Sequence, residues 1–219
     1  MLLVLVGVVL PILIVRSARR IGSGPLPISR MRFYKQTILF QLVLAILCAW
    51  TAWSHGILAI PLPERPLISW GAAVLMYVLT VVMLRLRWPS RTEAAKRRLY
   101  DILPHNRREM APYVFVCLVA GFAEEIIYRG VMTELLQRIV GIAVVTIVIV
   151  SVSFAGAHAM QGWPSVAGIF AIALACHALV WLAQSLVPVM VVHFAYDLTA
   201  GILIPRWYEK SVDIPLMTA

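Results

Sequence analysis

Charged side chains are scarce in this sequence. Asp, Glu, Lys and Arg make up 13% of its 219 residues, whereas the hydrophobic types make up 62%. A soluble domain has about a quarter charged residues and about half apolar ones. The composition therefore excludes an ordinary water-soluble protein and predicts an integral membrane protein. The length leaves room for a single membrane domain.

Acidic residues are the scarcer sign of charge, ten against 19 Lys and Arg, and most of the cations fall in two segments. Six lie within residues 16–35 and eight within residues 85–108. Cytoplasmic loops beside apolar runs have this composition under the positive-inside rule. The segments lack the aromatic and glycine patterns of nucleic-acid-binding modules. We therefore expect a lipid bilayer, and no nucleic acid, as a partner.

Disulfide, zinc-motif and β-barrel patterns are missing too. The three cysteines stand far apart without a CxxC pair, so we interpret them as small core residues. No segment alternates between polar and apolar residues as barrel strands do. The long apolar runs must then be helices, because only helices and closed barrels satisfy their backbone hydrogen bonds in lipid.

Seven apolar segments predict an all-α fold, a polytopic transmembrane helical bundle with about seven spans. The segments are residues 1–15, 36–53, 68–86, 111–133, 139–157, 164–183 and 187–204. We divide the chain into N-terminal transmembrane helices with basic cytoplasmic loops (1–110), a helical core (111–204) and a short C-terminal tail (205–219). The polar stretch 91–103 has helical spacing of its apolar residues, and we expect it along the cytoplasmic surface.

A few ionisable side chains fall inside the apolar segments, where each costs about 2.5–3.5 kcal/mol and is by default a functional hypothesis. They are Glu124, Glu125, Arg129, His158, His177, His193 and Asp197. Three pairs are four residues apart and so share a helix face: Glu125 with Arg129, Phe154 with His158, and His193 with Asp197. A turn near Val140–Gly141 would place Glu124 and His158 at similar depth. We interpret the isolated His177 as a satisfied or pocket-lining residue.

Glutamate and two histidines in a wet pocket suit peptide-bond hydrolysis. Glu124 can act as a general base toward water, with His158 helping to position that water. His193, beside Asp197, can donate a hydrogen bond to the developing oxyanion. Zinc is a competing use of the same residue types. The HExxH motif is absent, however, and three separate helices supply the side chains, so we expect no metal and no other cofactor.

The same residues carry a family resemblance. "EEIIYR" (124–129) resembles the EExxxR motif of the CAAX protease and bacteriocin-processing (CPBP or Abi) family, and "FAGAH" (154–158) resembles its FxxxH motif. "HFAYD" (193–197) is similar to its third motif, a His followed four residues later by a polar residue, often Asn. The three motifs occur in the family's order, within residues 111–204.

The resemblance implies a membrane-embedded endopeptidase of the glutamate type, similar to type II CAAX prenyl proteases. By carry-over Glu124 and His158 activate water, and His193 and Asp197 stabilise the oxyanion. Glu125, Arg129 and Phe154 shape the pocket. An ionised Asp197 cannot donate a hydrogen bond, so it is either protonated or orients His193. The substrate would be a peptide or protein at the membrane, prenylated or not, and the location a prokaryotic cytoplasmic membrane.

Two other functions use the same residues. A bacteriocin-immunity or scaffold protein of the same fold would keep them as a polar core without catalysis. A small proton-coupled transporter also needs intramembrane Glu and His, but it is expected to have inverted repeats and broken helices. Neither signal is clear in this sequence.

Overall fold

The apolar segments form helices in the computed structural model, which describes residues 1–21, 28–57 and 62–212. These ranges contain no strand, so the predicted all-α fold is confirmed. The helices are α1 (Leu2–Val4), η1 (Leu5–Val9), α2 (Leu10–Ile21), α3 (Arg30–Ser54), α4 (Pro66–Arg87), α5 (Glu93–Ile102), α6 (Arg107–Glu125), η2 (Ile126–Met132), α7 (Thr133–Val140), α8 (Ala143–Ala157), η3 (Ala159–Gln161), α9 (Trp163–Ala183) and α10 (Val187–Ser211).

Five helical stretches among the described residues are long and apolar enough to cross a membrane. They are α3, α4, the stretch Arg107–Val140 formed by α6, η2 and α7, and helices α9 and α10. Two further apolar helices, Leu2–Ser17 and Ala143–Ala157, are shorter than the ~20 residues that a span usually needs. All seven predicted segments are therefore helical, and the chain is a polytopic integral membrane protein.

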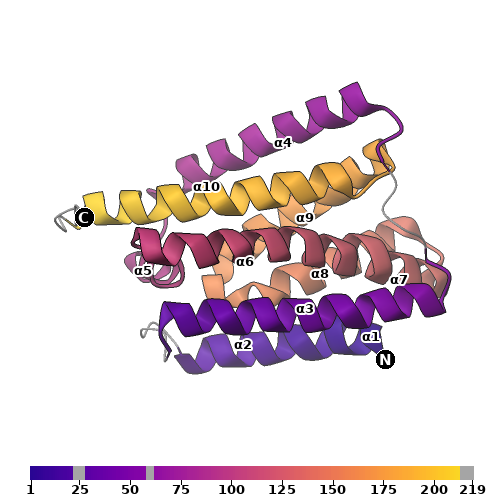
Figure 1. Cartoon of the computed structure of the whole chain (residues 1–219), viewed down its shortest axis with the longest axis horizontal. Coiled ribbons are helices and arrows are strands. Elements are labelled where there is room, and N and C mark those ends of the chain that lie inside the picture. Colours follow the sequence, from indigo (N-terminus) through magenta and orange to yellow (C-terminus); the bar gives the residue numbers. More distant parts are fainter. Residues whose placement is uncertain (22–27, 58–61, 213–219) are drawn as a thin grey trace.

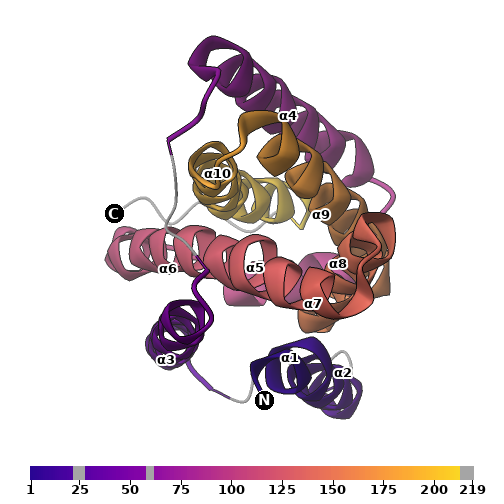
Figure 2. The same cartoon turned by 90° about the vertical axis from the view of Figure 1, so that its right-hand side faces the viewer.

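Helix α6 lies in the middle of the bundle, between α3 on one side and α10 on the other (Figure 1; Figure 2). A Cβ atom at Gly121 of α6 would lie 2.9 Å from the backbone nitrogen of Phe194 in α10, so only glycine permits this approach. Small residues allow close helix packing of this kind in membranes. The contact brings the end of α6, with Glu124 and Glu125, beside His193.

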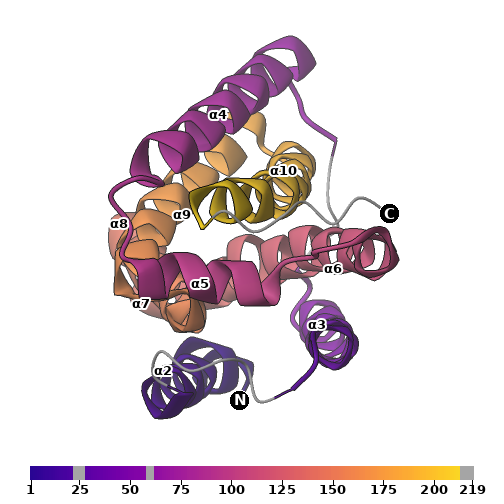
Figure 3. The ribbon, with the colours of Figure 1, turned by 90° about the vertical axis from the view of Figure 1, so that its left-hand side faces the viewer.

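The basic segments meet at one end of the bundle, where α2 and α4 end and α3 and α6 begin (Figure 1). Residues 22–27 of the first basic segment lie outside the described residues. Helix α5 lies across this end and packs against α10, α3 and η3 (Figure 3). Its buried Ala95 and Leu99 face the bundle, as the apolar spacing predicted.

The central helix ends at the turn that the sequence predicted near Val140–Gly141. It continues past the apolar segment, which ends at residue 133, to Val140, where Gly141 caps it with φ 72°. Directly after Glu125 the helix widens into the π-helical segment η2. π-Helical turns are rare and frequently occur at functional sites. This widening was not predicted, because an apolar segment of this composition is compatible with an α-helical or a π-helical turn.

The predicted boundary between the core and the C-terminal tail at residues 204 and 205 falls inside a helix. Helix α10 continues through Pro205 to Ser211. Trp207 and Tyr208 hold this extension by packing against Trp88 and Tyr100. Residues 205–211 are therefore helical, and residues 213–219 lie outside the described residues. The division into domains is otherwise still a prediction.

Candidate active site

A buried ion pair forms one wall of the site. Arg129 Nη1 donates to Glu125 Oε1 at 3.1 Å, and both side chains are fully buried. The guanidinium also lies over the ring of Phe154, 4.1 Å from its centroid, in a cation–π contact. Glu125 Oε2 and Arg129 Nη2 have no hydrogen-bond partner among the described residues. The predicted pairing of Glu125 with Arg129 is confirmed.

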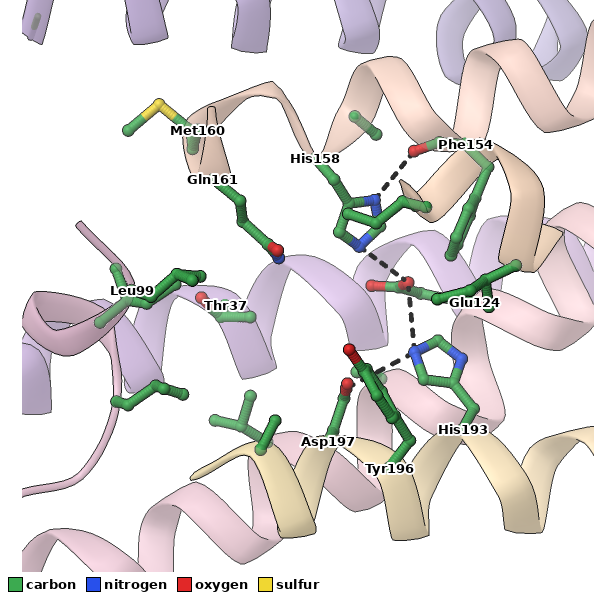
Figure 4. Close-up of a pocket in the computed structure, with 18 of the residues that line it drawn as sticks. Thr37, Leu99, Glu124, Phe154, His158, Met160, Gln161, His193, Tyr196 and Asp197 are labelled. Carbon is green, nitrogen blue, oxygen red and sulfur yellow. Dashed lines mark hydrogen bonds and ion pairs between the residues drawn. The ribbon is translucent and has the colours of Figure 1, made fainter. Parts of the chain in front are cut away.

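His193 of α10 joins this pair to the neighbouring acids. Its Nδ1 donates to Glu125 Oε1 at 2.7 Å, because a carboxylate only accepts. Its Nε2 lies 3.5 Å from Asp197 Oδ2 and 4.0 Å from Glu124 Oε2 (Figure 4). Glu125 therefore fixes the orientation of the ring, and Nε2 faces the other two carboxylates.

Glu124 is turned away from its neighbour Glu125, as the ~100° rotation per helical residue requires. Its Oε1 accepts a hydrogen bond from Nε2 of Gln41 in α3. Its Oε2 lies 3.7 Å from His158 Nε2 and has no hydrogen-bond partner among the described residues. The expectation that Glu124 and His158 lie at similar depth is thus confirmed.

His158 follows the last residue of α8 and is held by the backbone. Its Nδ1 donates to the carbonyl oxygen of Phe154 at 2.8 Å, because a carbonyl oxygen only accepts. In the neutral ring, Nε2 then carries a lone pair and points toward Glu124 (Figure 4). Two acceptors 3.7 Å apart cannot hydrogen-bond to each other, but both can accept from one donor between them.

These side chains line a cavity of about 460 Å³, within the size range of small-molecule and cofactor sites. Helices α3, α6, α9 and α10 contribute to its walls, and Tyr196 projects into it (Figure 4). The cavity continues toward the basic end, where it is lined by Arg91, by Arg98 of α5, and by Met160 and Gln161 of η3. Helix α5 is therefore part of the cavity wall as well as a surface helix.

The structure brings all seven predicted site residues to this one cavity: Glu124, Glu125, Arg129, Phe154, His158, His193 and Asp197. Their catalytic roles are still a prediction. His177 is buried on α9, is not among the lining residues, and its Nε2 has no hydrogen-bond partner among the described residues.

Sequence reasoning missed two features of the site. Gln41 was overlooked because only ionisable residues were considered, although a glutamine inside an apolar segment is a similar signal. The contact of His193 with Glu125 joins two helices 68 residues apart in sequence, and no spacing rule relates them.

Within residues 1–21, 28–57 and 62–212, no group of three or more His, Cys, Asp or Glu side chains has an arrangement that could hold a metal ion.

One comparison with known proteins gives a match. A family model described as "Type II CAAX prenyl endopeptidase Rce1-like" matches residues 106–199. This segment runs from the start of α6 into α10 and contains all seven predicted site residues. No curated protein and no solved structure gives a match.

Proposed function

We propose that this chain hydrolyses a peptide bond inside the membrane, because residues 106–199 match the family model of Rce1-like type II CAAX prenyl endopeptidases. One observation supports the proposal most strongly. Glu124 Oε2 lies 3.7 Å from His158 Nε2 and 4.0 Å from His193 Nε2, although Glu124 lies in α6, His193 lies in α10 and His158 directly follows α8. Ionisable groups at membrane depth are costly, and their convergence in a cavity favours a chemical role.

Glu124 and His158 together suit the activation of water. A water molecule between Glu124 Oε2 and the Nε2 lone pair of His158 donates one hydrogen to each. Glu124 takes a proton as the water oxygen attacks the carbonyl carbon of the substrate. The tetrahedral intermediate then collapses, the C–N bond breaks, and Glu124 returns the proton to the departing amine.

His193 is the candidate donor to the oxyanion. Because its Nδ1 donates to Glu125, its Nε2 can donate only when the ring is a doubly protonated imidazolium. Asp197, 3.5 Å from Nε2, then holds the charged ring as its carboxylate counter-ion and leaves the single Nε2 hydrogen for the oxyanion. Of the two roles open to Asp197 from the sequence, we therefore favour the orienting one. Glu125 and Arg129 hold the opposite edge of His193, with Phe154 packed against them.

The surroundings also suggest a substrate and a location. A peptide or protein segment, prenylated or not, would enter from the basic end of the bundle, toward which the cavity extends. The positive-inside rule assigns that end to the cytoplasm. We propose a prokaryotic cytoplasmic membrane and a reaction that needs no metal.

The test compares wild type with Glu124→Ala in detergent, on a library of short peptides of which some are farnesylated at a C-terminal Cys. Glu134→Ala is the matched control, because Glu134 lies in the same continuous helix but is exposed and paired with Arg138. Mass spectrometry should detect cleavage by wild type and the control. Glu124→Ala should lose at least ~100-fold in rate, the contribution of a general base.

Each remaining outcome has a separate meaning. Full activity in Glu124→Ala would contradict the glutamate mechanism. Loss of wild-type cleavage with a chelator, restored by zinc, would replace it with a metal-dependent one. Absence of cleavage by every protein would favour an immunity or scaffold protein of the same fold.

A further inference from the structure

Gln41 makes a contact with the site from outside the family segment 106–199. It lies in the middle of α3, only 9% exposed, and its Nε2 donates to Glu124 Oε1. The nitrogen must be the atom that faces Glu124, because a carboxylate can only accept. Gln41 therefore gives the two oxygens of Glu124 different surroundings.

That difference determines which oxygen can react. Oε1 is occupied by the amide of Gln41, whereas Oε2 faces His158 and His193. The terminal torsion of a glutamate is broad and nearly two-fold, so a free carboxylate would rotate. A donor on Oε1 restrains this rotation and keeps the lone pairs of Oε2 directed at the histidines.

Burying the amide of Gln41 costs more stability than burying an apolar side chain of similar size. Its Oε1 is buried and has no hydrogen-bond partner among the described residues. Such a group costs about 1–3 kcal/mol, so a leucine in the same place should be at least as stable. Among the described residues, Glu124 is the one hydrogen-bond partner of this side chain. Its stability cost thus points to a role in the site rather than in packing.

We propose that Gln41 is a positioning residue that fixes the carboxylate of Glu124 with Oε2 directed at His158 and His193. The inference rests on the proposed function of Glu124 as the general base. It extends the site to α3, in the part of the chain that the family model does not match.

The kinetic test uses Gln41→Leu, with Gln36→Leu as the matched control. Gln36 is the same residue type on the same helix, but it is exposed and does not line the cavity. Gln41→Leu should lower kcat about 10- to 100-fold, the usual effect of losing a hydrogen bond to a charged group, with little change in KM. Its melting temperature in detergent should stay the same or rise. The control should behave as wild type.

The pH profile separates positioning from packing. Loss of the amide donor favours the protonated acid over the carboxylate, so the acid limb of kcat should move to higher pH in Gln41→Leu. An infrared titration can follow the carboxyl band of Glu124 directly, identified by its loss in Glu124→Gln. The midpoint of that band should move in the same direction.

Three results would overturn the inference: unchanged kcat and infrared midpoint in Gln41→Leu, equal effects in Gln36→Leu, or loss of folding in both Gln41→Leu and Gln41→Met. The last result would assign Gln41 to packing. If wild type cleaves no peptide, the proposed function fails. The infrared midpoint would still test the contact between Gln41 and Glu124.

Discussion

Helix α6 carries two glutamates that each pair with an arginine and contact a histidine residue, one at the start of the helix and one at its end. Glu109 pairs with Arg30 at 3.0 Å, and their side chains are 16% and 27% exposed. Glu125 pairs with Arg129 at 3.1 Å, and theirs are 0% and 1% exposed. The two pairs thus have the same residue types and nearly the same distances, but only the second pair is fully buried.

The surroundings distinguish the partly exposed pair from the buried pair at the cavity. Glu109 lies in the first turn of α6, where the positive end of the helix dipole favours an acid, and it also accepts from the backbone nitrogen of His105. These contacts are sufficient to explain its presence. Glu125 has no such benefit at the buried end of the helix. Its visible effect is to hold Arg129 and His193 in place at the cavity.

The largest expected effect comes from breaking the buried pair on one side. Arg129→Met leaves the charge of Glu125 buried without its main partner, which costs about 3–5 kcal/mol in comparable sites. Thermal unfolding in detergent should show a large drop in melting temperature. Peptide cleavage should fall as well, because Glu125, which orients His193, is no longer held by an arginine.

A double variant distinguishes two causes of instability, the unpaired charge of Glu125 and the lost packing of Arg129. Glu125→Gln removes the charge but keeps an amide oxygen that can accept from His193 Nδ1. Combined with Arg129→Met, it should recover most of the lost stability, since replacing both ions of a buried pair is often nearly neutral. A double variant as unstable as Arg129→Met alone would show that packing, and not the charge, dominates.

The matched change at the other end of α6 should have a much smaller effect. Arg30→Met leaves Glu109 with the backbone nitrogen of His105 and the helix N-terminus as partners. Partly exposed ion pairs contribute about 0–1 kcal/mol, and salt screens them. The melting temperature should therefore change little, and the difference from wild type should shrink in high salt. A loss as large as that of Arg129→Met would remove the distinction between the two pairs.

The comparison also shows what the sequence could predict. Long apolar runs specify helices in lipid without reference to their neighbours, so the all-α bundle was predictable. Spacing of four residues within one helix predicted the contact of Glu125 with Arg129, and equal distances from one turn predicted that Glu124 and His158 lie at similar depth. Each of these inferences uses one helix or one hairpin.

Contacts between helices far apart in sequence were beyond these rules. Gln41 and Glu124 are 83 residues apart, and their contact depends on how α3 packs against α6. The π-helical segment after Glu125 was equally hidden, because one extra residue per turn leaves the apolar composition unchanged. Composition gave no measure of the cavity either, since the cavity depends on the packing of several helices.

The smallest expected effect is a pH dependence at the basic end. His105 is half-buried, its Nε2 donates to the carbonyl oxygen of Tyr100, and the Tyr100 ring stacks on it at 3.8 Å. Burial lowers the pKa of His105 below its usual value near 6.5. The unfolded chain therefore binds a proton at higher pH than the folded one does. The stability that neutral His105 contributes is full above about pH 6.5 and falls as the pH drops below it.

His105→Gln should flatten this dependence, because an amide can still donate to Tyr100 but does not titrate. The measurement is the difference in melting temperature between pH 7.5 and pH 5.5 in detergent. His55→Gln is the control, since His55 is exposed at the far end of α3. Equal pH dependence in wild type and His105→Gln would mean that the basic end holds α5 without help from a neutral histidine. The histidine beside Glu109 would then have no measurable part in stability, and the contrast with His193 would be sharper still.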